Sequence, residues 1–173
     1  MTFTLIGMPG SGKSCMGRVV SRKLKMKLVD ADKVIETNRG QKLQEMIALL
    51  GVEKFREIEE SELVAISVDN AIISTGGSAV YYEKAMEHFK SLGKVIYLYV
   101  SFDTMLKRIG DFSKRGIVMR PDQSIRDVYE ERSALYEKYA DITINCDGEA
   151  YKRYQNAVIK AITDEIMKSE SGK

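Results

Sequence analysis

The sequence is poor in the residues that build metal centres and disulfide frameworks. It contains two cysteines, Cys15 and Cys146, and one histidine, His88, in a chain of 173 residues. A chain of this length can bury a core large enough to fold without disulfides, and the cysteines lack the spacing of a metal site. We therefore expect a reducing, cytoplasmic setting. His88 lies in a polar helical stretch, and we expect it to be a surface residue.

Long apolar runs and an excess of charge of one sign are also missing. No apolar run approaches the roughly 18 residues that a membrane helix needs, and the N-terminal segment lacks the basic start of a signal peptide. The 27 Lys and Arg residues nearly balance the 25 Asp and Glu residues, which leaves a net charge of +2. This balance argues against nucleic acid or an anionic membrane as the main partner. A partner must instead be recognised by a local group of residues.

What remains is the composition of an ordinary globular protein, with 44% hydrophobic and 30% charged residues. The length fits one domain over residues 1–173, and we expect a monomer. Strand-like and helix-like segments alternate, which is typical of a parallel sheet with helices on its faces. We place strands at Thr2–Ile6, Lys27–Val29, Ala71–Ser74, Lys94–Val100 and Asp141–Asn145, and helices at Ser14–Lys25, Lys33–Thr37, Leu43–Leu50, Val52–Val68, Tyr82–Ser91, Phe102–Ile109, Ser124–Tyr139 and Glu149–Met167. The pattern predicts a three-layer α/β/α fold with a five-stranded parallel sheet.

A glycine-rich loop separates the first strand from the first helix. Gly7-Met-Pro-Gly-Ser-Gly-Lys13-Ser14 matches the phosphate-loop pattern of Gly, four free positions, Gly, Lys and Ser or Thr. In this place backbone N–H groups can surround a phosphate, Lys13 can reach the β- and γ-phosphates, and Ser14 can ligate Mg²⁺. The alternative is a glycine-rich turn that happens to contain Lys and Ser, but the flanking strand and helix favour the phosphate loop. We predict ATP or GTP binding by Gly10, Ser11, Gly12, Lys13, Ser14 and Cys15.

Two carboxylates follow the second strand, at the edge of the sheet that also carries the glycine loop. Asp30 and Asp32 are two residues apart, so in extended chain their side chains share a face. One can hold the water shell of Mg²⁺, and the other can accept or orient the proton of a substrate hydroxyl. The alternative makes Asp30 a loop residue and Asp32 the N-cap of the next helix. We favour the first interpretation, because a cap needs one Asp and two are present.

With these motifs the chain resembles the shikimate kinases, in the nucleoside monophosphate kinase-like branch of phosphate-loop folds. The resemblance spans most of the chain, and only its C-terminal end lacks a recognisable motif. The matching motifs are Gly7–Ser14, Asp30-Ala-Asp32, Gly51-Val-Glu-Lys-Phe55-Arg56 with Glu59, Thr75-Gly76-Gly77, Glu131-Arg132 with Leu135-Tyr136, and Ala140-Asp141.

The resemblance implies roles for the carboxylates and glycines. Asp30, with Ser14, is similar to the family's metal site, and Asp32 resembles the residue that binds the acceptor's hydroxyls and acts as base. Gly76 and Gly77 resemble the backbone platform beneath the acceptor. Ser78 stands where the family has a third glycine, and its side chain adds a hydroxyl that could tighten or reshape that platform.

The resemblance also implies roles for arginines. Arg56 and Arg132 resemble the pair that clamps the acceptor's carboxylate, a task suited to bidentate guanidinium groups. Without the family pattern, Arg56 fits a solvated salt-bridge face equally well, because acidic residues flank it at helical spacings. We also assign Arg108 to the nucleotide site.

Residues 110–123 correspond to the family's lid, and residues 31–60 to its acceptor-binding region. The lid departs from the family pattern, in which an Arg is followed by Pro and two apolar residues. Arg120-Pro121 keeps the pair but continues with Asp and Gln, whereas Arg115 fits better by its spacing from neighbouring arginines. We favour Arg115 as the arginine that reaches the transferred phosphoryl group, with Arg120 as the second candidate.

The expected function is therefore that of a small-molecule kinase. It would pass the γ-phosphoryl group of ATP, with Mg²⁺ as cofactor, to a hydroxyl of a small carboxylate, shikimate above all, with Lys13, Asp32 and the lid arginine as catalytic residues. A related kinase for another hydroxy acid, such as gluconate or homoserine, is the first alternative. The second is a nucleotide-binding regulatory module that has lost catalysis, against which Lys13, Ser14 and the Asp pair argue.

Overall fold

The computed structural model describes residues 1–110, 119, 122–148 and 150–171 of the chain. Its centre is a parallel sheet in the order β2-β3-β1-β4-β5. The strands are β1 (Thr2–Ile6), β2 (Lys27–Asp30), β3 (Ala71–Ser74), β4 (Gly93–Tyr99) and β5 (Ile142–Asn145). The predicted five-stranded parallel sheet is confirmed.

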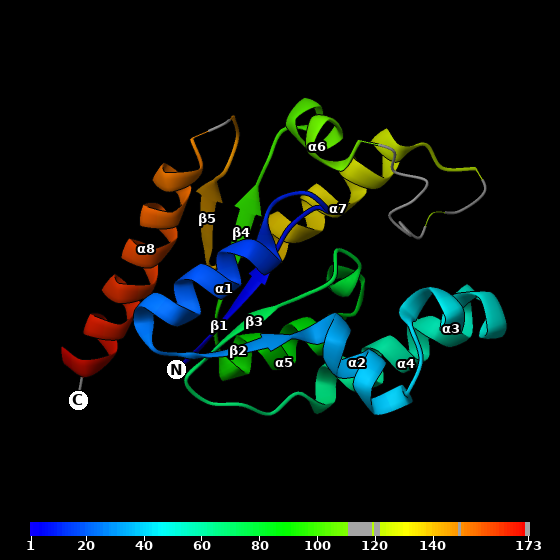
Figure 1. Ribbon diagram of the computed structural model, residues 1–173, viewed down its shortest axis with the longest axis horizontal. Coiled ribbons are helices and arrows are strands. Elements are labelled where there is room, and N and C mark those ends of the chain that lie inside the picture. Colours follow the sequence, from blue (N-terminus) through cyan, green and yellow to red (C-terminus); the bar gives the residue numbers. More distant parts are fainter. Residues whose placement is uncertain (111–118, 120–121, 149, 172–173) are drawn as a thin grey trace.

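Helices cover both faces of this sheet and produce three layers (Figure 1). On one face α1 (Lys13–Leu24) packs on β1, β2 and β3, and α8 (Tyr151–Ser171) packs on β5 and α1. On the other face α5 (Glu83–Leu92) and α7 (Ile125–Tyr139) pack on β4. The remaining helices are α2 (Ala31–Arg39), α3 (Leu43–Leu50), α4 (Val52–Ala65), α6 (Phe102–Ile109) and a 3₁₀ turn, η1 (Ala79–Tyr81). No helix in these described ranges is both long and apolar enough to cross a membrane.

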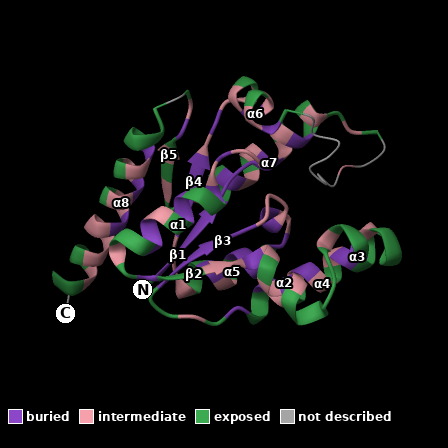
Figure 2. Ribbon diagram, viewed as in Figure 1, coloured by how far each residue is buried: buried purple, intermediate pink, exposed green. Residues whose placement is uncertain are grey.

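The core lies between the layers and is densest around the three central strands. Every residue of β1 and β3 is buried, and so is the apolar run Val95–Leu98 of β4, as expected for a strand covered on both faces (Figure 2). The edge strands β2 and β5 are only partly covered. Burial of these β-branched and aliphatic side chains is the main source of stability for such a sheet.

Several predicted helix boundaries are wrong, among them the end of the second helix, which lies at Arg39 rather than Thr37. The second helix begins at Ala31 rather than Lys33, because the Asp30 side chain accepts a hydrogen bond from the Lys33 N–H at 3.3 Å and caps it. The fourth ends at Ala65 rather than Val68, where Ile66 turns extended. The last helix extends beyond Met167 to Ser171.

The prediction that His88 is a surface residue is also wrong. His88 is half-buried, and its Nε2 lies 2.7 Å from the Ile66 carbonyl oxygen.

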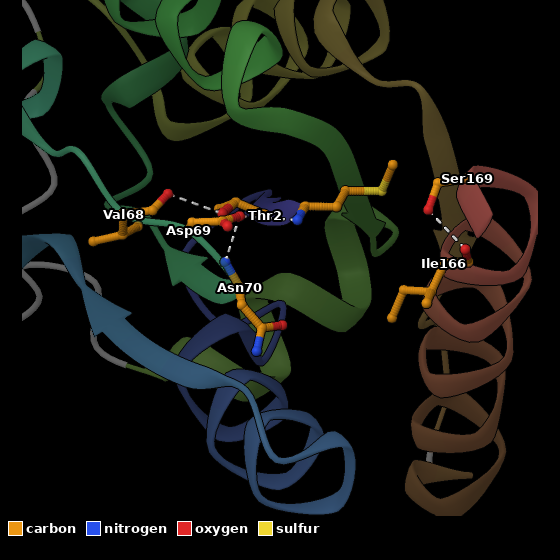
Figure 3. A network of polar contacts seen from close by, with 7 residues as sticks. Thr2, Val68, Asp69, Asn70, Ile166 and Ser169 are labelled. Atoms are coloured by element: carbon orange, nitrogen blue, oxygen red, sulfur yellow. Dashed lines mark hydrogen bonds and ion pairs between the residues drawn. The ribbon is translucent and has the colours of Figure 1, made fainter. Parts of the chain in front are cut away.

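Polar contacts hold the start of β1 against the segment that leads into β3. Figure 3 shows the Thr2 hydroxyl donating to the Val68 carbonyl at 3.1 Å, beside Asp69, whose carboxylate accepts from the Met1 amino group at 2.9 Å. At the carboxyl ends of the neighbouring strands β1 and β3, the Thr75 hydroxyl donates to the Leu5 carbonyl at 3.0 Å. These contacts fix the two strands side by side. The glycine loop after β1 therefore lies next to Gly76 after β3.

Candidate active site

The carboxyl ends of β1, β2 and β3 open into a cleft with a volume of about 670 Å³. In an open parallel sheet this edge is the usual place for a ligand. The structure brings most of the predicted site residues together here. The cleft is lined by Gly10, Gly12, Lys13, Ser14, Cys15, Asp32, Glu59, Gly76, Gly77, Ser78, Arg108 and Arg132, among others.

The glycine loop has the backbone shape that a phosphate cradle requires. Gly10 and Gly12 have φ of 80° and 97°, a left-handed conformation that disfavours side chains. Around Gly12 no atom lies within 4 Å of where a Cβ would stand, so the loop is open there. The Ser11 hydroxyl is buried and has no hydrogen-bond partner among the described residues. A buried, unsatisfied donor beside the N-terminus of α1 fits a phosphate group.

Lys13 is buried at the floor of the cleft. Its Nζ donates to the carbonyl oxygens of Gly7, at 2.7 Å, and Met8, at 3.1 Å. Burial lowers the pKa of Lys13 to about 8, although nearby Asp32 favours the charged form. The ammonium group is therefore held by its own loop, close to where phosphates would bind.

Asp30 and Asp32 do not share a face of an extended strand, contrary to the prediction. The helix α2 begins directly after Asp30, so Asp30 is the N-cap and Asp32 lies in the first turn. The capping alternative was thus correct in kind but named the wrong residue. Asp32 faces the platform after β3, since a Cβ on Gly76 would lie 2.7 Å from its Oδ1.

Asp32 has the electrostatics of a proton acceptor. Burial raises the pKa of its carboxyl to about 6, and the negative charge of Glu59 adds to the rise, while Lys13 opposes it. A carboxylate with this pKa is ionised at neutral pH and is more basic than an exposed Asp. It can therefore accept a proton from a substrate hydroxyl placed on the glycine platform.

Arg132 lies buried against the same platform, with 2% of its surface exposed. A Cβ on Gly77 would stand 3.2 Å from one guanidinium nitrogen, and the Tyr136 hydroxyl donates to the Gly77 carbonyl at 2.7 Å. The guanidinium also lies over the Tyr81 ring, 5.2 Å from its centroid. A planar cation is thus fixed where it can bind an anionic group resting on Gly76 and Gly77.

Arg56 lies outside the wall of the main cleft. It lines a small recess beside it, which shares Glu59, Ser78 and Arg132 with the cleft. Its guanidinium lies 6.0 Å from the Tyr81 ring centroid and 3.5 Å from a carboxylate oxygen of Glu53. The structure therefore contains the surface ion pair of the alternative interpretation, and it also places Arg56 beside Arg132 around one ring.

A carboxylate at the back of the cleft has hydrogen-bonding partners that the sequence did not indicate. Glu59 is 3% exposed, and its two oxygens accept from the Ser78 hydroxyl at 2.8 Å and the Tyr82 hydroxyl at 2.5 Å. Burial raises the pKa of Glu59, while these hydrogen bonds and the two arginines oppose the rise. The motif that contains Glu59 was recognised, but Tyr82 carried no signal beyond the start of a helix.

Arg108 lines the cleft and links it to the loop after β5. Arg108, on α6, donates to the carbonyl oxygens of Cys146, at 2.8 Å, and Gly148, at 2.6 Å. Cys15 lines the cleft, and its sulfur accepts a hydrogen bond from Tyr151 at 2.7 Å. Arg108 therefore fixes this loop against the phosphate-binding end of the cleft. The two lid candidates, Arg115 and Arg120, lie outside the described residues, as does most of the predicted lid.

The predicted metal ligands lie together in a groove that adjoins the cleft. Ser14 and Asp30 both line this groove, and Ser14 also lines the cleft. Within the described ranges no group of three His, Cys, Asp or Glu side chains could hold a metal ion. A hydroxyl and a carboxylate next to a phosphate loop fit Mg²⁺, which binds few protein ligands and completes its shell with phosphate oxygens and water.

Comparisons with known proteins agree with this geometry. The family model for shikimate kinase matches residues 9–168. A shikimate kinase of Sulfurihydrogenibium is 34% identical over 165 residues, covering 95% of this chain and 96% of the relative. One from Vibrio cholerae is 31% identical and covers 94% and 95%.

Solved structures are similar as well. Shikimate kinase from Aquifex aeolicus has a TM-score of 0.80 at 30% identity and covers 100% of both chains. The Acinetobacter baumannii enzyme in complex with shikimate has a TM-score of 0.81 at 27% identity and covers 94% of this chain and 93% of its own.

Proposed function

This chain belongs to the shikimate kinase family, and we propose that it transfers the γ-phosphoryl group of ATP to a hydroxyl of shikimate. One observation carries the proposal most directly. Asp32 and Arg132 face the Gly76–Gly77 platform in the same cleft as the phosphate loop. A base and a carboxylate-binding cation thus meet within reach of a phosphate cradle. The complex of the Acinetobacter baumannii relative with shikimate supports this acceptor.

The phosphate loop binds the nucleotide in this proposal. Backbone N–H groups from Gly10 to Cys15 surround the phosphates, and Lys13 exchanges its two carbonyl partners for phosphate oxygens. Ser14 and Asp30 would hold Mg²⁺, which neutralises phosphate charge when bound. Because Lys13 is already beside the loop, little rearrangement is needed to stabilise charge that develops on the γ-phosphoryl group.

Asp32 and the arginines act on the acceptor. Arg132 binds the carboxylate from the platform side, and Arg56 approaches from the recess beside it. The acceptor's hydroxyl oxygen attacks the γ-phosphorus, the bond from that phosphorus to the bridging oxygen of ADP breaks, and Asp32 takes the hydroxyl proton. Orientation of the acceptor between these groups supplies much of the rate enhancement.

Three further parts of the proposal rest on the sequence. Arg115 is the lid arginine that contacts the transferred group, with Arg120 as the second candidate. The protein acts as a monomer. It acts in the cytoplasm, in the pathway to aromatic amino acids, which is consistent with two cysteines that form no disulfide.

A second acceptor class is favoured by one residue. Ser78 places a hydroxyl in the cleft at the third position of the platform, where the family resemblance has glycine. The hydroxyl donates its proton to Glu59 at 2.8 Å but can still accept a hydrogen bond from a differently substituted acid, so a kinase for gluconate or homoserine is the second candidate.

The proposal is tested by measuring ADP release with a panel of hydroxy acids. We expect turnover with shikimate and little with gluconate, homoserine or water. Lys13→Met should lower kcat by at least about 100-fold, because a preorganised charge at the transferred group is lost. Lys23→Met, an exposed lysine of the same helix, is the matched control and should keep full activity. Turnover of another acid but not shikimate would contradict the proposed acceptor.

A further inference from the structure

Glu59 joins two segments that build opposite sides of the acceptor site. It lies on α4, in the region that also carries Arg56, whereas Ser78 and Tyr82 come from the chain that follows the glycine platform. The Ser78 hydroxyl donates to Oε1 at 2.8 Å and the Tyr82 hydroxyl to Oε2 at 2.5 Å. Both oxygens of a single buried carboxylate are therefore held by hydroxyls of the other segment.

The surroundings of Glu59 explain why these hydroxyls matter. A carboxylate that is 3% exposed has lost most of its hydration and is stable only where hydrogen bonds and charges replace it. Arg56, on its own helix, and Arg132, on α7, favour the ionised form, whereas Asp32, on α2, carries a charge of the same sign. Without the two hydroxyls, neither oxygen of Glu59 would have the hydrogen bond that fixes its place.

The position of Glu59 affects both parts of the acceptor site. Arg56 is three residues before Glu59, so the two side chains lie on the same side of α4. Ser78 directly follows Gly77, where an added Cβ would stand 3.2 Å from a guanidinium nitrogen of Arg132. Glu59 and Ser78 line both the cleft and the recess of Arg56. A contact between them therefore fixes the distance from α4 to the platform.

We propose that Ser78 and Tyr82 are positioning residues for the acceptor: their hydroxyls hold Glu59 and so fix Arg56 and Arg132 relative to Gly76 and Gly77. This inference rests on the proposed function and deepens it. The Ser78 contact depends on a side chain that the family's third glycine lacks. It is therefore a device of this chain's own residues for binding a small hydroxylated carboxylate.

The test removes one hydroxyl at a time, with Ser78→Ala, Tyr82→Phe and the double variant. We expect the KM for shikimate to rise about tenfold in each single variant, the size of one well-placed hydrogen bond. The KM for ATP should stay within about twofold, because the phosphate loop is untouched. Since both hydroxyls hold one carboxylate, the double variant should differ from the product of the two single effects.

Matched variants separate positioning from a general structural effect. Ser78→Thr keeps the hydroxyl and should retain a KM for shikimate near that of the wild type. Ser91→Ala and Tyr139→Phe remove hydroxyls whose partners are the His88 carbonyl and the Lys138 ammonium group, and they should leave both KM values unchanged. Tyr82→Phe keeps the buried ring, so it preserves the packing of α5, and circular dichroism checks that each variant is folded. If one variant does not fold, the other decides.

Two results would overturn the proposal: an unchanged KM for the acceptor in both single variants, or equal rises in the KM values for acceptor and ATP. If the wild type phosphorylates another acid of the panel instead of shikimate, the KM values of each variant relative to the wild type are measured with that acid. In that case the proposed acceptor fails while the positioning role is still decided. Turnover of no acid by the folded wild type would overturn both.

Discussion

Lys13, Asp32 and Glu59 are ionisable side chains that the cleft shields from water. Burial lowers the pKa of Lys13 to about 8 and raises the pKa of Asp32 to about 6, and it also raises that of Glu59. Each shift disfavours the charged form of its group, and the proposed reaction uses the charges of Lys13 and Asp32. The site therefore holds its charged groups at a cost in stability, as is common where proteins place catalytic groups.

Asp32→Asn should stabilise the protein at neutral pH while it abolishes phosphoryl transfer. The native pKa of about 6 exceeds the usual 3.8, so between these values the folded state binds more protons than the unfolded state. The raised pKa of Asp32 therefore adds its full contribution to the free energy of unfolding below pH ~4, and this contribution is lost as pH rises through ~6. At pH 7 we expect Asn to raise the free energy of unfolding by up to about 3 kcal/mol, the value of a shift of roughly two pKa units, in which the attraction to Lys13 is already included.

This prediction is checked by urea unfolding of both proteins at pH 4 and pH 7, without nucleotide or Mg²⁺. The gain in the free energy of unfolding of Asp32→Asn over the wild type should shrink toward zero at pH 4, where Asp32 of the folded wild type is protonated and, like Asn, uncharged. An equal gain at both pH values would mean that altered packing, rather than the charge of Asp32, causes the change. Glu36→Gln, which alters a partly exposed, ion-paired carboxylate on the same helix, serves as a comparison and should not stabilise.

Among the elements, α2 has an N-terminus with two tasks. Its cap, Asp30, accepts a hydrogen bond from the Lys33 N–H and is also the proposed metal ligand, while the first turn presents Asp32 to the platform. The helix dipole adds to this, since acidic groups are stabilised at helix N-termini. The start of α2 directly after β2 is therefore what aims Asp32 into the cleft.

Asp30→Ser and Asp30→Ala separate the two tasks of that residue. Serine caps helices about as well as aspartate, so Asp30→Ser should change stability by less than ~0.5 kcal/mol, whereas Asp30→Ala should cost about 1 kcal/mol. Both should raise the Mg²⁺ concentration that gives half-maximal turnover, because both remove the carboxylate. The measurements are thermal unfolding and a Mg²⁺ titration of activity. A normal Mg²⁺ dependence in folded Asp30→Ser would show that Asp30 acts as a cap alone.

At the scale of the whole molecule, the acceptor region shares one core with the sheet. Ile35 of α2, Met46 of α3 and Phe55 of α4 belong to the same buried cluster as the residues of β1, β3 and β4. The elements that carry Asp32 and Arg56 are thus packed on the same interior as those that carry the phosphate loop. A displacement of side chains in the acceptor region therefore shifts those packed under the phosphate loop, because dense interiors transmit small displacements.

Heat should therefore unfold the protein in one transition, with equal calorimetric and van't Hoff enthalpies, as for a single domain. ATP with Mg²⁺, added at about 100 times its dissociation constant, should stabilise the native state by about 2.7 kcal/mol and move the whole transition upward. Scanning calorimetry with and without ligand measures both quantities. A separate early transition that ATP leaves in place would contradict a single domain over residues 1–173.

The sequence by itself determined the elements and the phosphate site, because these depend on local patterns. The eight positions from Gly7 to Ser14 dictate their own loop, and the apolar run of β4 dictates a buried strand. The site residues that are far apart in the sequence were assigned through the family resemblance. The structure does bring together in one cleft Lys13, Asp32, Gly76, Gly77 and Arg132. What local pattern could not give was the start of α2, where a capping hydrogen bond competed with the extended strand.

Only the tertiary structure decided how the carboxylates and arginines are used. Arg56 lies in the recess beside the cleft rather than in the cleft wall. The hydrogen-bond donors to Glu59 are 19 and 23 residues away in the chain. Such pairings depend on how α4 packs against the turn after β3. The physical reason is that a hydrogen bond between segments is set by their separation and angle in space, to a few tenths of an ångström, and no local periodicity encodes these.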